Sequence, residues 1–217
     1  MPRSWVAGNR TMPVALSELV SDFAVSIALA DSRRPQASNV RSGVQFQVGI
    51  GPHTETQTAE LVGRELELLK PALYRGRVSL GVPYPEMLRQ KCDLCIGPQE
   101  PYDWAVEIKL LRFLGDNGKA NDNILMHLLS PYAQHRSALT DCTKLRQSAL
   151  GRQKALIIYG YDSQEWPLEP AVEAFEILAG RRSVLGPRLS GEFRGLVHPV
   201  HTSGAVFGWE LLAVAEQ

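Results

Sequence analysis

Apolar residues recur along this chain with two periods, one typical of helices and one typical of strands. In the segment 14–30 they fall at Leu16, Leu19, Val20, Phe23 and Ile27, a spacing that predicts an amphipathic helix. A second helix is expected from a cap at Thr56 or Thr58 to Lys70, where Pro71 stops it. Both helices would place one apolar side on a core.

Short apolar runs predict strands at several places. Two of them, Cys92–Ile96 and Trp104–Leu111, are joined by the turn-rich segment 97–101 and are expected to lie side by side. Further strands are expected at 77–83, 153–161 and 204–214, and a short one at 44–49.

The remaining helical patterns complete an α/β fold with a mixed central sheet flanked by helices. Residues 124–150 are helical in pattern, with a cap at Asn121 or Asp122 and a break near Ser130–Pro131, and a last helix is expected at 168–179. From residue 56 the predicted order is helix, three strands, helix, strand. We expect one domain over 1–217, with a core at 56–161, an N-terminal helical extension at 14–31 and a C-terminal helix and strand at 168–215.

Three charged residues interrupt the two neighbouring strands. Asp93 lies between Cys92 and Leu94, and Glu107 and Lys109 alternate with apolar residues. Alternation puts Glu107 and Lys109 on one face, and Asp93 with Cys95 on the face opposite Cys92. Buried charges must be paired or bind a metal, and two carboxylates suit Mg²⁺. A cross-strand ion pair on an exposed sheet face is the structural alternative.

The pattern Asp93-x13-Glu107-x-Lys109 resembles the catalytic signature of the PD-(D/E)xK nucleases. Cys92 stands where that signature has proline. The resemblance covers about residues 56–161 and implies a restriction-endonuclease-like αβββαβ core with additions at both ends. It also implies that Asp93, Glu107 and the backbone carbonyl of Ile108 hold Mg²⁺, for which Mn²⁺ can substitute, and that Lys109 orients or deprotonates the attacking water.

A fourth carboxylate, Glu65, lies on the apolar side of the second helix, between Leu61 and Leu69. Many nucleases of the family carry an additional glutamate on the helix before the sheet. Glu65 is therefore a candidate for the metal site, directly or through water, or else a structural partner for a lysine or arginine.

Cations gather in the second half of the chain, where Arg136, Lys144 and Arg146 lie on or beside the helix expected after the Glu107 strand. We take these three as candidate phosphate contacts, and a solvated helix face is the alternative. The three cysteines and five histidines lack zinc-type spacing on these elements, so buried free thiols are expected.

Composition is that of an ordinary globular protein, with 44% hydrophobic and 21% charged residues and a net charge of zero. Neither a signal-peptide core in residues 1–13 nor an apolar run of membrane-spanning length is present in the sequence, so a cytoplasmic protein is expected. Phosphate-binding loops, dinucleotide fingerprints and G-x-S-x-G elbows are also missing from the sequence.

Two functions remain open at this point. The first is a Mg²⁺-dependent endonuclease that hydrolyses DNA, of restriction or phage-defence type, acting as a homodimer. The second is a catalytically silent protein of the same fold that binds nucleic acid or serves as an assembly subunit.

Overall fold

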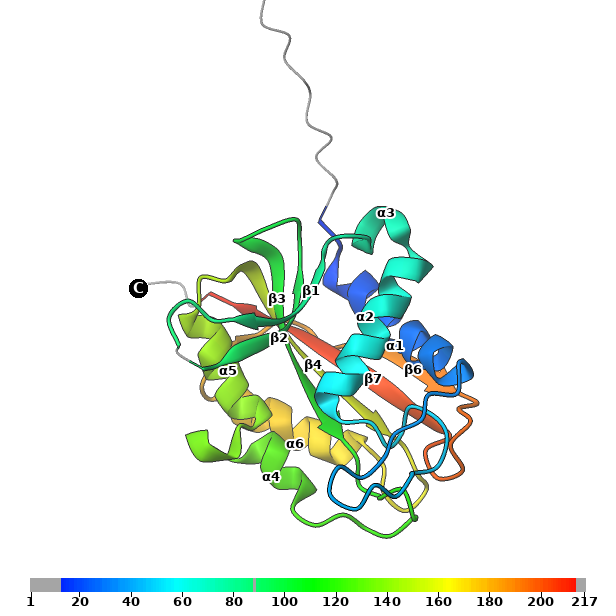
Figure 1. Cartoon of the computed structure of the whole chain (residues 1–217). Coiled ribbons are helices and arrows are strands. Elements are labelled where there is room, and N and C mark those ends of the chain that lie inside the picture. The colour runs from blue at the N-terminus through cyan, green and yellow to red at the C-terminus, as the bar shows by residue number, and fades with distance from the viewer. Residues whose placement is uncertain (1–12, 88, 214–217) are drawn as a thin grey trace, which may run out of the picture.

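The structure is a computed structural model that describes residues 13–87 and 89–213. A seven-stranded sheet runs through it, with helices on both faces (Figure 1). The first half of the chain contributes α1 (Leu16–Ser32), α2 (Glu55–Leu69), α3 (Pro71–Tyr74), β1 (Val78–Pro83), β2 (Lys91–Ile96) and β3 (Tyr102–Leu111). The second half contributes α4 (Ile124–Leu129), the 3₁₀ turn η1 (Ala133–His135), α5 (Ala138–Gln147), β4 (Gly151–Tyr161), α6 (Glu169–Gly180), β5 (Val184–Leu185), β6 (Leu189–Arg194) and β7 (Ser203–Leu212).

The sheet is mixed and mostly antiparallel. Its order is β1-β2-β3-β4-β7-β5, and β6 also pairs with β7. Among the strands of the described residues, only β3 and β4 form a parallel pair, with Tyr102 opposite Gly151 at one end and Leu111 opposite Gly160 at the other. A parallel pair needs a crossover, and the segment from α4 to α5 provides it. The predicted α/β class with a mixed sheet between helices is confirmed.

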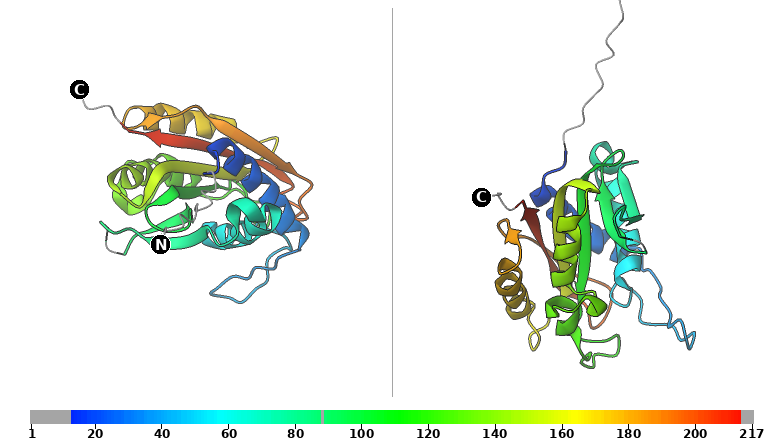
Figure 2. Two further views of the ribbon diagram at one scale, coloured as in Figure 1. Left: turned by 90° about the horizontal axis from the view of Figure 1, so that it is seen from above. Right: turned by 90° about the vertical axis from the view of Figure 1, so that its left-hand side faces the viewer.

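Two apolar cores cover the two faces of the sheet. On one face α1 and α2 pack on β-strand residues that include Trp104, Val106 and Ile108. On the other face α5 and α6 pack on residues that include Leu156 and Ile158. Figure 2 shows the resulting layers, with α1 and α2 on one side of the strands and α4, α5 and α6 on the other. No helix in the described ranges is long and apolar enough to cross a membrane.

Several predicted boundaries need correction. Helix α2 begins earlier than expected, because Thr54, and neither Thr56 nor Thr58, caps it in a capping box with Gln57. Helix α4 has Asn123 as its N-cap, without a side-chain hydrogen bond. The strand expected at 44–49 does not form, since that segment pairs only through an isolated bridge between Ser38 and Gln45.

A buried pair of histidines lies in the loop directly before β7. The Nδ1 atom of His198 accepts hydrogen bonds from the backbone N–H groups of Val200 and His201, so its proton lies on Nε2, 2.9 Å from Asp116 Oδ1. His201 stacks between His198 and Tyr161, with ring centroids 4.5 and 4.6 Å away. Its Nε2 atom is buried without a hydrogen-bond partner among the described residues.

The lowered pKa of His201 predicts that the free energy of unfolding decreases in acid. Burial, then His198 and Arg112, lower its pKa from 6.5 to about 3, against the opposing effect of Asp116. The unfolded chain therefore binds the proton first, so the stabilisation is complete above about pH 6.5 and is lost as the pH falls towards 3. The loss is on the order of 4 kcal/mol. Urea titrations of wild type and His201→Phe should give a steeper acid fall for wild type, and equal slopes would contradict the prediction.

Candidate active site

The strand β3 has an open edge beyond Val106, because β2 stops pairing with it there while staying paired with β1 as far as Lys91. Pairing with β2 ends at Leu94 opposite Val106, whereas pairing with β4 on the other side continues to Leu111. Beyond Val106, the backbone groups that face β2 must find other partners, because an unpaired buried N–H is costly. Two carboxylates supply them.

These carboxylates come from different elements and bind alternate amides of β3. Asp93 Oδ2 accepts from the N–H of Ile108 at 2.8 Å, and Glu55 Oε2 accepts from the N–H of Leu110 at 2.7 Å. In a strand, the N–H and C=O of one residue point to the same side. The carbonyl of Ile108 therefore faces the same edge as Asp93. Figure 1 shows the first turn of α2, which carries Glu55, at the same end of the sheet as the carboxyl end of β3.

Glu107 and Lys109 project from β3 towards α5, as strand alternation requires. Lys109 Nζ lies 3.0 Å from Asp141 Oδ2 and 3.7 Å from Glu55 Oε1. Lys144 Nζ lies 3.0 Å from Asp141 Oδ1 and 2.9 Å from Glu107 Oε1. The residues thus form a chain of alternating charges across the end of β3.

Tyr84, between β1 and β2, closes this chain. Its hydroxyl donates to Glu107 Oε1 at 2.5 Å, and the ammonium of Lys144 lies 5.3 Å from the centre of its ring. We call the set of these groups the carboxylate cluster, which consists of Glu55, Tyr84, Asp93, Glu107, Lys109, Asp141 and Lys144. With all groups ionised except the tyrosine, four carboxylates face two ammonium groups, an excess of two negative charges.

Burial and the neighbouring charges shift the pKa values of several groups in the cluster. Burial, then Asp141 and Asp93, raise the pKa of Glu107 well above its ordinary value, and Lys144 only partly opposes them. Burial also raises the pKa of Glu55. Burial lowers the pKa of Lys109, but Asp141 and Glu55 outweigh it, so the pKa is raised overall and Lys109 is an ammonium at neutral pH. A divalent cation would balance the cluster.

Replacing Lys144 tests how Glu107 is held. Because Lys144 lowers the pKa of Glu107, Lys144→Met should raise that pKa further, whereas Lys144→Arg, which keeps the charge, should leave it near the wild-type value. A ¹³C NMR titration of the glutamate carboxyl groups measures the shift. An unchanged titration of Glu107 in Lys144→Met would show that the pair does not form.

Three of the four predicted catalytic residues are brought together, and the fourth is not. Asp93, Glu107 and Lys109 meet around the end of β3. The buried carboxylate of Glu65 instead accepts from Arg33 at the end of α1, with Nη2 at 2.9 Å from Oε2. Ten residues of helix separate Glu65 from Glu55, about 15 Å along the axis. Of the two alternatives raised for Glu65, its contacts match the structural one.

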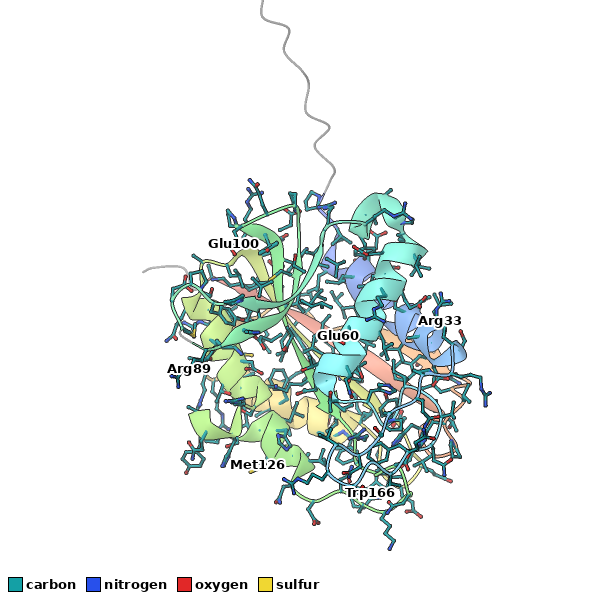
Figure 3. All side chains as sticks on the ribbon, viewed as in Figure 1. Arg33, Glu60, Arg89, Glu100, Met126 and Trp166 are labelled. Atoms are coloured by element: carbon teal, nitrogen blue, oxygen red, sulfur yellow. The ribbon has the colours of Figure 1, made fainter. Side chains whose placement is uncertain are left out.

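Figure 3 shows where this arginine lies. Arg33 projects at the margin of the molecule beside α1, whereas Arg89, in the connection between β1 and β2 that also contains Tyr84, lies on the opposite side of the view. Sequence spacing on a helix gives the buried face but not the neighbour behind it, so the sequence alone could not show that Arg33 lies beside Glu65.

The three predicted phosphate contacts also lie in different environments. Lys144 is partly buried in the carboxylate cluster, with 15% of its side chain exposed. Arg146 is exposed and donates to the carbonyl of Arg182, and Arg136 is exposed beside η1. Lys144 therefore belongs to the carboxylate cluster, whereas the two arginines lie at the surface.

Glu55, Tyr84 and Asp141 are site residues that the sequence analysis missed. Asp141 carried a signal, since it lies on the buried side of α5 with Ala138 and Leu145, where an acid needs a partner. Glu55 carried none, because an acid in the first turn of a helix is ordinary.

The cysteines are free and buried as expected, but one face assignment is wrong. Cys92 packs in the same apolar core as Cys95, whereas Leu94 and Ile96 pack in the opposite one. The alternation breaks at Asp93, which turns to the edge of β3 and lies opposite Gly81, a residue with φ of +60°.

Within the described residues, no group of three or more histidine, cysteine, aspartate or glutamate side chains could hold a metal by itself. No family model matches the chain, and comparisons with curated proteins and with solved structures also give no match. The resemblance to the PD-(D/E)xK nucleases therefore rests on the residue pattern of this chain alone.

Proposed function

We propose that this protein is a divalent-metal-dependent phosphodiesterase that hydrolyses DNA with the carboxylate cluster. The observation that carries the proposal is the end of β3, where Glu107 and Lys109 share one face and Asp93 binds the amide of the residue between them. The order of elements from α2 to β4 supports a core of the restriction-endonuclease-like type. The sheet order β1-β2-β3-β4, with β3 and β4 parallel, gives further support.

The donor set fits Mg²⁺ or Mn²⁺. Asp93 uses Oδ2 for the amide of Ile108, and both contacts of Glu107 fall on Oε1, so Asp93 Oδ1 and Glu107 Oε2 remain for another ligand. Mg²⁺ commonly takes one or two carboxylates and completes its shell with water and phosphate oxygens. Asp93, Glu107 and the carbonyl of Ile108 would hold the ion, which supplies polarisation of a phosphoryl oxygen when bound.

Lys109 acts as a cation in this proposal. Its raised pKa keeps it protonated, so it orients the attacking water and stabilises negative charge on the phosphoryl oxygens, and it does not serve as the base. Glu55 lies 3.7 Å from Lys109 and has a raised pKa, so it is placed to accept the proton of the water. The water oxygen bonds to phosphorus as the bond to the leaving sugar oxygen breaks.

Tyr84 and Lys144 hold Glu107 in position. Both donate to the same oxygen, which fixes the plane of the carboxylate and points its other oxygen away from them. These two residues are positioning residues, since they act through Glu107.

DNA is the proposed substrate, and restriction or phage defence by a cytoplasmic homodimer is the proposed role. Two cuts in opposite strands require two such sites, which is what a dimer provides. The exposed Arg136 and Arg146 remain proposed contacts to the phosphate backbone.

A catalytically silent protein of this fold is the second candidate. The observation that favours it is that Lys144 and Tyr84 already bind Glu107 Oε1 without any metal. Such a protein would bind nucleic acid without cutting it.

A cleavage assay on supercoiled plasmid and on linear duplex DNA distinguishes the nuclease from the catalytically silent protein. Wild type should cut in Mg²⁺ or Mn²⁺ and be inactive in EDTA, and Asp93→Asn should be inactive throughout. The exposed acid Glu192, which pairs with Arg194 on β6, gives the control Glu192→Gln, which should cut like wild type. Cutting that persists in EDTA or in Asp93→Asn would refute the assigned site, and an inert wild type would favour the silent protein.

A further inference from the structure

A hairpin projects from the connection between α1 and α2. Residues 37–46 form two short arms held by three backbone hydrogen bonds. Two of them, from Asn39 N to Val44 O at 2.8 Å and from Phe46 N to Ala37 O at 3.0 Å, flank the bridge between Ser38 and Gln45, and the third runs from Gly43 N to Asn39 O at 2.8 Å. Figure 2 shows this segment reaching away from the layers of the fold in both views.

The turn at its tip is ordered by its own side chains. Asn39 Oδ1 accepts from the backbone N–H groups of Arg41 and Ser42, and Gly43, with φ of +68°, reverses the chain. The tip therefore presents a defined surface instead of a flexible loop.

This tip is apolar and basic at once. Val40 is 98% exposed and Val44 is 63% exposed, although nothing in the fold requires apolar residues there. Arg41 lies next to Val40 and is exposed, as is the amide side chain of Gln45. Between Asp31 and Glu55 the sequence has no acidic residue, so no carboxylate of this segment offsets Arg34 and Arg41.

The base of the hairpin is fixed to the elements that carry the cluster. Gln47 N donates to Asp116, which follows β3, and Arg112 at the end of β3 donates to the carbonyl of Gly51 at 2.6 Å. Asp31, 1% exposed, accepts from Ile50 N and Val197 N. Thr54 then caps α2 directly before Glu55. The base of the hairpin is thus tied to the end of β3 and to the start of α2, two elements that carry cluster residues.

We propose that the 37–46 hairpin inserts into the major groove of duplex DNA and holds the duplex against the carboxylate cluster. This inference rests on the proposed function for the identity of the ligand. A two-stranded ribbon fits the major groove, where an exposed arginine binds guanine or phosphate, an amide side chain binds adenine, and an apolar side chain contacts the methyl group of thymine. The hairpin carries one side chain of each kind, which are the arginine Arg41, the amide Gln45 and the apolar Val40. A second copy of the chain would need an apolar or acidic partner surface, and Arg41 at the tip favours the polyanion.

Binding measured without metal tests the hairpin apart from cleavage. The probe is a fluorescein-labelled 30-base-pair duplex in EDTA, compared with a single strand of the same length by fluorescence anisotropy. The double variant Val40→Ser/Arg41→Ala should bind the duplex at least about tenfold more weakly, with little change for the single strand. The minor-groove ligand netropsin should not displace wild type.

The control variant is Arg75→Ala, an exposed arginine after α3, at the opposite end of α2 from Glu55, which should bind the duplex like wild type. Equal duplex affinity of the double variant and wild type would overturn the proposal, as would an equal loss for the single strand or no duplex binding by wild type. A dimer that dissociates in the double variant while duplex affinity is unchanged would also overturn it, and would make the tip an interface between copies. The cleavage assay with Asp93→Asn tests the proposed nuclease activity on its own. A failure of the proposed hairpin contact is therefore distinguishable from a failure of the proposed nuclease activity.

Discussion

Replacing Lys109 with methionine is expected to lower the rate of metal-dependent DNA cleavage by about 10²–10⁴-fold. The methionine keeps much of the length of the side chain but removes the ammonium that lies between Asp141 and Glu55. Without it the attacking water loses its orientation and the phosphoryl oxygens lose a nearby cation. The measurement is the single-turnover rate on linear duplex DNA with protein in excess.

A matched lysine controls for the loss of charge. Lys154 on β4 donates only to the carbonyl of Arg146, so Lys154→Met should cut DNA at close to the wild-type rate. Circular dichroism should give both variants a folded spectrum. A rate for Lys109→Met within threefold of wild type would remove Lys109 from the mechanism.

Glu55→Gln is expected to lower the cleavage rate about 10–100-fold, whereas Glu65→Gln should leave it unchanged. Glu55 contacts Lys109 and the edge of β3, while Glu65 binds Arg33 at the end of α1. The amide in Glu55→Gln can still accept from the N–H of Leu110, so the strand edge is kept while the proton acceptor is removed. The same single-turnover assay measures both variants.

The two glutamates control for one another, because both lie on α2 and both are changed to the same amide. Glu65→Gln should lower the melting temperature slightly, since its buried side chain loses the ion pair with Arg33. A large loss of activity in Glu65→Gln with little loss in Glu55→Gln would mean that the additional glutamate of the site had been correctly placed by the sequence and wrongly placed by the geometry.

The elements that were predicted well are those with a strong apolar period. The runs that became β2, β3, β4 and β7 bury most of their side chains, and α1 buries a continuous stripe, so pattern alone indicated them. β5 has two residues, and β6 alternates exposed polar residues with only Phe193 buried, so neither gave a signal. The segment 44–49 had the composition of a strand but became one arm of an exposed hairpin.

The candidate site was predictable where the chemistry lies within one strand. Glu107 and Lys109 are two residues apart, and strand alternation places them on one face whatever the rest of the chain does. Residues contributed by other elements, such as Glu55 and Asp141, depend on how helices lie over the sheet, and local patterns do not contain that information. Lys144 appeared to be a surface cation because its two carboxylate partners are distant or unremarkable in the sequence.

The central claim is that the end of β3 binds a divalent cation through Asp93, Glu107 and the carbonyl of Ile108. Isothermal titration of wild type and Asp93→Asn with Mn²⁺ at neutral pH tests it most directly. We expect one ion bound per chain in wild type and none in Asp93→Asn, with Glu192→Gln binding like wild type. Absence of Mn²⁺ binding in wild type, or equal binding in wild type and Asp93→Asn, would contradict the account.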